Sequence, residues 1–82
     1  MLNVSYEPAL LKLIEKIKDS ALKERVKKQI QKTIENPETG KPMRYCRKGT
    51  REVYIPPFRL SYAYIKENET IVFLDLHHKD EQ

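Results

Sequence analysis

The chain has 82 residues, a formal net charge of +4 and a pI near 9.2, which predicts a single domain over residues 1–82 with no room for a second core. Its one cysteine, Cys46, excludes an intramolecular disulfide and a cysteine zinc cluster, and indicates a reducing cytoplasm. No apolar run approaches the roughly 20 residues that span a bilayer, so we expect no membrane partner, and the moderate positive charge is compatible with an anionic one.

The first predicted elements are a short strand and a helix. Leu2 to Ser5 is read as the strand, and Pro8 suits the first turn of the helix, where its missing N–H costs nothing. From Ala9 to Lys18 the apolar residues fall on one helical face, at Leu10, Leu13, Ile14 and Ile17.

A second helix is predicted directly after the first. Asp19 and Ser20 interrupt the apolar pattern and offer oxygens for an N-cap. The helix that follows has a narrow apolar stripe, at Leu22, Val26, Ile30 and Ile34. It ends at Asn36, because a residue that precedes a proline avoids the helical region of backbone space. Two helices joined so closely form an antiparallel hairpin.

The polar sides of both predicted helices are rich in lysine, at Lys12, Lys16, Lys23, Lys27, Lys28 and Lys32. Acidic residues are interleaved with these lysines, at Glu15, Glu24 and Glu35. Mixed charges of this kind usually form a solvated surface, so we do not interpret the stripe as a nucleic-acid face.

The second half of the chain predicts a sheet. After a turn from Pro37 to Pro42, in which Gly40 is expected to supply a positive φ, the apolar period changes to two. Strands are predicted over Arg51 to Ile55 and Phe58 to Ile65, joined by Pro56 and Pro57, and a third strand follows a hairpin turn at Glu67–Glu69.

Alternation along these strands separates an apolar face from a polar one. The apolar face is predicted to hold Val53, Ile55, Phe58, Leu60, Tyr62, Tyr64, Val72, Leu74 and Leu76. The opposite face then carries Glu52, Tyr54, Arg59, Ser61, Asp75 and His77. We therefore predict an α+β fold of order β-α-α-β-β-β, with the N-terminal strand and helical hairpin packed on one face of a mostly antiparallel twisted sheet.

The polar face has the residue types needed for RNA cleavage. That reaction needs a base for the ribose 2′-OH, a cation for the phosphorane and an acid for the leaving 5′-oxygen. Glu52 is the candidate base, Arg59 the phosphate-binding cation and His77 or His78 the acid. Tyr54 is the candidate to stack on a base or to donate a hydrogen bond to the phosphate. Each residue also has a structural interpretation, such as an ordinary cross-strand ion pair between Glu52 and Arg59.

A cationic loop precedes the strands and has no acidic residue before Glu52. With Tyr54, its cations are the candidate RNA-binding residues: Arg44, Arg47, Lys48 and Arg51. The alternative is a solvated loop. We expect no cofactor, and a metal site at His77, His78, Asp75 and Asp80 is disfavoured because adjacent residues of a strand point to opposite faces.

Two stretches resemble the RelE/ParE superfamily of small toxins from type II toxin–antitoxin modules. That family has an "enP..gkpl" turn, matched here by ENPETGKPM at residues 35–43. It continues with a strand of the form "RelRvgdYRviY", matched by REVYIPPFRLSY at residues 51–62. The resemblance covers nearly the whole chain and implies a RelE-like fold. The chain departs from the pattern at Tyr54, where arginine is usual, and at Pro56–Pro57, where the family has a glycine turn.

The resemblance implies a cytoplasmic toxin that acts as an mRNA interferase, a metal-independent and ribosome-dependent endoribonuclease that inhibits translation. Its implied partners are mRNA, the ribosome and a cognate antitoxin protein. Arg59 matches the arginine that grips the scissile phosphate, and Glu52 a position that is lysine in some members and a glutamate base in others. Lys79 matches a second basic residue at the end of the last strand, and His77 or His78 a catalytic histidine.

A second reading comes from the same family, because fold alone does not settle activity. Some members inhibit DNA gyrase and cleave no RNA, so the chain is alternatively a ParE-like gyrase inhibitor or an inactive RelE-fold binding protein. Glu52, Arg59 and a histidine favour the nuclease. The chain stops at Gln82, without the terminal tyrosine that is common in active toxins, which favours the alternative.

Overall fold

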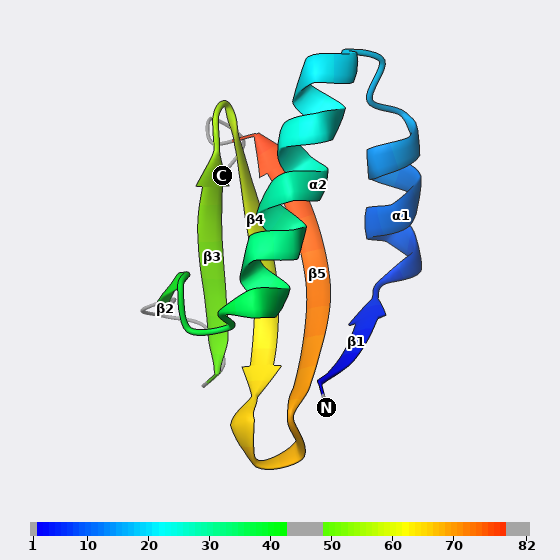
Figure 1. The fold of residues 1–82 in the computed structure, drawn as a ribbon. Helices are drawn as coiled ribbons and strands as arrows, with labels where there is room; N and C mark the ends of the chain where they lie inside the picture. The colour runs from blue at the N-terminus through cyan, green and yellow to red at the C-terminus, as the bar shows by residue number, and fades with distance from the viewer. Residues whose placement is uncertain (1, 43–48, 79–82) are drawn as a thin grey trace.

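The computed structural model describes residues 2–42 and 49–78, which form a sheet with two helices on one face (Figure 1). In chain order the elements are β1 (Asn3–Tyr6), α1 (Pro8–Glu15), α2 (Ser20–Glu35), β2 (Lys41–Pro42), β3 (Thr50–Ile55), β4 (Phe58–Ile65), the 3-10 turn η1 (Lys66–Asn68) and β5 (Thr70–His78). The predicted α+β class and the packing of the helical hairpin on one face are confirmed. The two-residue strand β2 was not predicted.

The strands lie in the order β1-β5-β4-β3-β2, with β1 parallel to β5 and every other pair antiparallel. The edge strand β2 pairs with β3 only through Lys41 opposite Glu52 and Pro42 opposite Arg51. Beyond Glu52, no strand of the described residues pairs with the outer edge of β3. This outer edge of β3 lies next to α2.

The core lies between the helices and the sheet. Its buried members are Leu10, Leu22, Val26, Ile30, Val53, Ile55, Leu60, Tyr62, Ile71, Phe73 and Leu76. The predicted cap of α2 is confirmed, because the Asp19 carboxylate accepts hydrogen bonds from the N–H groups of Ala21 (3.0 Å) and Leu22 (3.2 Å). α1 is shorter than predicted and ends at Glu15, where the Ile17 N–H turns back to the Ile14 carbonyl in a tighter turn. In residues 2–42 and 49–78, neither helix is long and apolar enough to cross a membrane.

The predicted burial of β5 is partly wrong. Ile71 and Phe73 are fully buried under the helices, whereas Val72 and Leu74, predicted for the core, are only half-buried. The cause is an irregularity in the ladder: Ser61 pairs with Asp75 but the next residue, Tyr62, pairs with Phe73. Leu74 is therefore an extra residue, and a bulge of this kind reverses the facing of every residue beyond it.

The turn before β2 is held by Tyr62, whose side chain is fully buried. Its hydroxyl donates to the Pro37 carbonyl (2.7 Å) and accepts from the Gly40 N–H (3.0 Å). Burial raises the pKa of Tyr62, opposed by the Gly40 hydrogen bond and the charge of Arg51. The expected positive φ at Gly40 is wrong, since it belongs to Gly49 (91°). Gly40 is instead needed for close approach, because a Cβ there would lie 2.6 Å from the Tyr62 hydroxyl oxygen.

Candidate functional site

The sheet face away from the helices gathers polar side chains from β3, β4 and β5. The register places Tyr54 opposite Arg59, and Arg59 opposite His77. One step along the strands, Glu52 lies opposite Ser61, and Ser61 opposite Asp75. Residues opposite each other in an antiparallel ladder project to the same side, so these side chains share one face. We call this group, Glu52, Tyr54, Arg59, Ser61, Asp75 and His77, the open-face cluster.

Arg59 is the central cation of the open-face cluster. Its Nη1 lies 3.5 Å from Oε1 of Glu52, and the two side chains are 36% and 26% exposed. The distance is long for a hydrogen bond, so the pair is a modest ion pair. A guanidinium has five N–H donors, and Glu52 engages only one nitrogen. Arg59 therefore keeps donors for an anion while Glu52 remains beside it.

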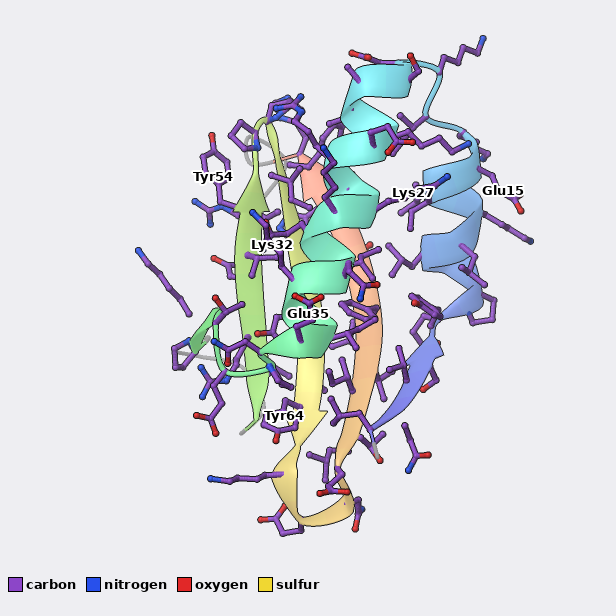
Figure 2. The ribbon with its side chains drawn as sticks, in the orientation of Figure 1. Glu15, Lys27, Lys32, Glu35, Tyr54 and Tyr64 are labelled. Carbon is purple, nitrogen blue, oxygen red and sulfur yellow. The ribbon has the colours of Figure 1, made fainter. Side chains whose placement is uncertain are left out.

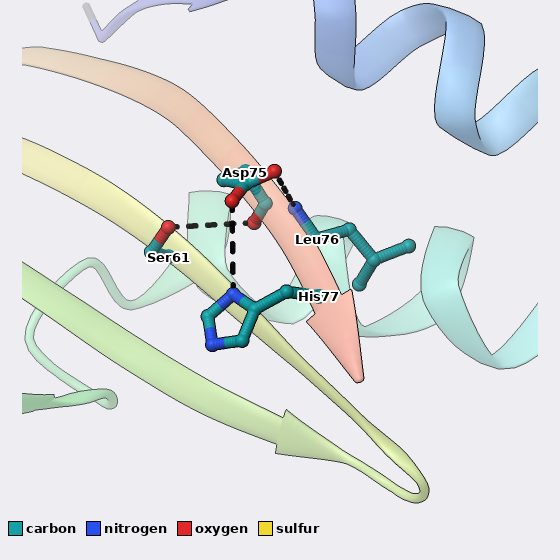
Figure 3. Close-up of polar contacts among 4 residues, drawn as sticks. All are labelled: Ser61, Asp75, Leu76 and His77. Carbon is teal, nitrogen blue, oxygen red and sulfur yellow. Dashed lines mark hydrogen bonds and ion pairs between the residues drawn. The ribbon is translucent and has the colours of Figure 1, made fainter. Parts of the chain in front are cut away.

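His77 and Asp75 form a second pair on the neighbouring strand (Figure 3). The Nδ1 atom of His77 lies 3.7 Å from Oδ2 of Asp75, beyond hydrogen-bond range, and this buried nitrogen has no hydrogen-bond partner among the described residues. Asp75 is itself positioned, because its Oδ1 accepts the Leu76 N–H at 2.9 Å and its carbonyl accepts the Ser61 hydroxyl at 3.4 Å. Sequence reasoning placed Asp75 on this face but gave it no catalytic role. The spacing of two along a strand was the available signal.

The two candidate histidines point to opposite sides of the sheet. His78 pairs with Phe58 in the register and meets its ring edge-on, with centroids 5.5 Å apart at 78°. Phe58 packs against the core, so His78 lies on the helix side, away from Arg59. Of the two, only His77 belongs to the open-face cluster.

The remaining predicted residues are placed differently. Arg51 lies opposite Tyr62 on the helix side, where its Nη1 donates to the carbonyls of Glu38 (3.1 Å) and Gly40 (2.8 Å). Tyr54 is 53% exposed at the sheet edge. Arg44, Arg47, Lys48 and Lys79 lie outside the residues that the structure describes.

A hollow of about 370 Å³ opens beside the Glu52–Arg59 pair. It is lined by Gln29, Thr39, Gly40, Lys41, Glu52, Val53, Tyr54 and Arg59. Since Glu52, Arg59 and His77 stand on three adjacent strands, a carboxylate and an imidazole lie on either side of the guanidinium. Strands are about 4.8 Å apart, so an anion held at Arg59 would have a carboxylate on one side and an imidazole on the other.

Comparison with known proteins identifies relatives of the whole chain. A family model described as "ParE toxin of type II toxin-antitoxin system, parDE" matches residues 4–82. The fold is similar to a chain of the intact E. coli RelBE toxin–antitoxin complex, with a TM-score of 0.78 and 16% identity over 95% of this chain and 96% of that one. It is similar to the isolated E. coli RelE toxin, with a TM-score of 0.79 and 17% identity over 100% and 88% of the two chains.

A chain of the RelBE2 toxin–antitoxin complex from Mycobacterium tuberculosis is also similar, with a TM-score of 0.73 and 25% identity over 95% of this chain and 98% of that one. A comparison with curated proteins gave no match. The likenesses to the E. coli structures, at 16% and 17% identity, concern the fold and not an activity.

Proposed function

The chain belongs to the ParE toxin family of type II toxin–antitoxin systems, and we propose that it acts there as a RelE-like mRNA interferase, a metal-independent endoribonuclease that inhibits translation. The observation that carries the proposal is that Glu52, Arg59 and His77 stand on three adjacent strands of the open face, with Glu52 3.5 Å from Arg59 and His77 directly opposite Arg59. A carboxylate, a guanidinium and an imidazole in that order supply a base, a phosphate clamp and an acid without further groups.

In the proposed reaction Glu52 takes the proton of the ribose 2′-OH, and the 2′-oxygen bonds to the adjacent phosphorus. Arg59 binds the phosphate and stabilises the charge that grows on the phosphorane oxygens. The bond from phosphorus to the 5′-oxygen then breaks, and His77 gives its proton to that oxygen. The products are a 2′,3′-cyclic phosphate and a 5′-hydroxyl.

Asp75 is proposed to orient His77. A carboxylate beside one imidazole nitrogen favours the tautomer and ring position that present the other nitrogen to the substrate. The 3.7 Å gap between Asp75 and Nδ1 is consistent with this, since catalytic hydrogen bonds are often long before substrate binds and shorten in the complex. His78 and Lys79 are proposed only as RNA contacts near the end of β5. Arg44, Arg47 and Lys48 are proposed as further phosphate contacts.

The proposal includes partners. Two of the similar structures are toxin–antitoxin complexes, which supports a cognate antitoxin protein for this chain, and we propose that it covers the open-face cluster. As a RelE-like mRNA interferase, the protein is proposed to act in the cytoplasm, with mRNA on the ribosome as its substrate.

The second candidate is a ParE-like toxin that inhibits gyrase and cleaves no RNA. The observation that favours it is the family match itself, which is to the ParE model. Under this reading Glu52 and Arg59 are a surface ion pair, and the open face meets a protein.

The test is cleavage of a defined mRNA by the purified protein, with and without ribosomes, beside a gyrase supercoiling assay. Arg59→Ala should lower the cleavage rate by about 10²-fold or more, the size typical when a donor to a developing negative charge is removed. Lys12→Ala, an exposed α1 cation away from the open face, is the control and should cleave normally. Gyrase inhibition by a wild-type protein that leaves mRNA intact would establish the second candidate instead.

A further inference from the structure

The side of α2 that faces β3 carries three exposed cations, Arg25, Lys28 and Lys32. At a rise of 1.5 Å per residue they are spaced by about 4.5 and 6 Å along the helix axis. Figure 2 shows Lys32 on the side of α2 toward β3, whereas Lys27 lies on the side toward α1 and Glu35 projects in front. In the described part of the chain none of the three cations makes an ion pair.

These cations line a second hollow, of about 200 Å³, with the end of β3 as its other wall. Its lining residues are Arg25, Lys28, Gln29, Lys32, Tyr54, Ile55 and Pro56, with no acidic residue among the described ones. The acidic residues of α2, Glu24 and Glu35, are not part of it. The surface of α2 as a whole carries both charges, but the side that lines this hollow carries only cations.

The second hollow continues into the first. Both are lined by Gln29 and Tyr54, and the first also contains Glu52 and Arg59. The path runs around the outer edge of β3, with which no described strand pairs beyond Glu52. A flexible chain that follows the path therefore passes from α2, over Tyr54, to the guanidinium of Arg59.

We propose that this surface, the α2–β3 groove formed by Arg25, Lys28, Lys32 and Tyr54, binds the single-stranded RNA next to the cleavage site. The three cations contact phosphates, and the ring of Tyr54 stacks on a base. The inference rests on the proposed function and extends it by assigning a path for the substrate outside the open-face cluster.

The chemistry of the groove favours RNA over an acidic peptide. Proteins that hold single strands combine a cationic groove with aromatic side chains on which bases stack. Tyr54 is 53% exposed and lines both hollows. A peptide carboxylate pairs with the lysines but has no flat ring to place on this surface, whereas every nucleotide brings both a phosphate and a base.

The experiment compares two triple variants that lose the same charge. The groove variant is Arg25→Gln, Lys28→Gln and Lys32→Gln. The control variant is Lys16→Gln, Lys23→Gln and Lys27→Gln, which lie away from both hollows. Binding of a fluorescent single-stranded RNA is measured by anisotropy across a salt series, after equal thermal unfolding of the proteins has been verified.

The groove variant should make the slope of log affinity against log salt less negative by about 2, because each phosphate neutralised on a single strand contributes about −0.7 to that slope. The control variant should change the slope far less. Tyr54→Leu should weaken binding by about tenfold with the slope unchanged, since it removes stacking and no charge.

Equal slopes for the two triple variants, in a protein that still cleaves RNA, would overturn the groove and leave the proposed function standing. An acidic peptide is titrated in the same salt series; if the groove variant loses binding of the peptide while its RNA binding is unchanged, the groove is also overturned. A wild-type protein that cleaves no RNA but shows the slope difference would refute the nuclease while supporting the groove.

Discussion

At the residue scale, Tyr62 and Arg59 show two different uses of strand β4. Tyr62 points to the helix side, is fully buried and ties β4 to the turn before β2 through Pro37 and Gly40. Arg59 points to the other side and is 36% exposed next to Glu52. The Tyr62 hydroxyl therefore stabilises the fold, whereas the Arg59 guanidinium faces solvent and keeps N–H donors for a ligand.

Tyr62→Phe should lower the free energy of unfolding by about 1–3 kcal/mol, because it leaves the buried Gly40 N–H and Pro37 carbonyl without a partner. Urea unfolding measures this loss. Tyr64→Phe is the matched control, since the Tyr64 hydroxyl makes no hydrogen bond within residues 2–42 and 49–78, and it should be close to neutral.

The difference in unfolding free energy between wild type and Tyr62→Phe should depend on pH. Burial raises the pKa of Tyr62 above 10.0, so the folded protein keeps the phenol proton after the unfolded chain begins to lose it. The stabilisation is full below about pH 10 and is lost as pH rises toward the folded pKa. The advantage of wild type over Tyr62→Phe should therefore shrink above pH 10, and an advantage that grows there would contradict this account.

At the element scale, α2 begins where Asp19 satisfies two backbone N–H groups, and this helix presents both the core stripe and the groove cations. In strand β5, the bulge changes which side of the sheet the residues face. The extra residue Leu74 allows Ile71 and Phe73 to be buried while Asp75 and His77 still reach the open face. Regular alternation would have placed all four on one side.

Asp19→Ala should cost about 1 kcal/mol of unfolding free energy, the usual value for an N-cap lost to alanine. Asp19→Asn keeps the capping oxygen and should recover most of that loss. Thermal unfolding of the three proteins, followed by circular dichroism, checks the ranking. If the asparagine variant is as unstable as the alanine variant, the cap hydrogen bonds are not the source of the effect.

At the scale of the whole molecule, one thin core joins both helices to strands β3, β4 and β5. Val26 is completely buried and lies at the centre of the apolar stripe of α2 that covers the sheet. In a chain of 82 residues the total stability is modest, because small domains bury a limited fraction of their surface.

Val26→Asp should therefore unfold the entire protein, since an unpaired buried charge costs several kcal/mol. The far-ultraviolet circular dichroism and the dispersion of amide resonances should both collapse. Gln31→Asp, an equal change of charge at an exposed position of the same helix, should leave them intact. A folded Val26→Asp variant would mean that α2 does not seat on the sheet through this face.

The sequence by itself determined the features that depend on local periodicity. The stripe of Leu22, Val26 and Ile30, and the alternation that places Arg59 and Tyr62 on opposite sides of β4, follow from the geometry of a single helix or strand. The family turn and strand pattern at residues 35–43 and 51–62 likewise sufficed to indicate the fold.

Only the tertiary structure decided the features that depend on which segments meet. The bulge at Leu74 arises in the pairing of β5 with β4, so no pattern within β5 alone could show that Ile71 and Phe73 are buried. The α2–β3 groove likewise joins cations of one element to Tyr54 of another. Strand register and the packing of distant segments depend on the segment that is contacted, and the sequence of one segment does not specify which other segment that will be.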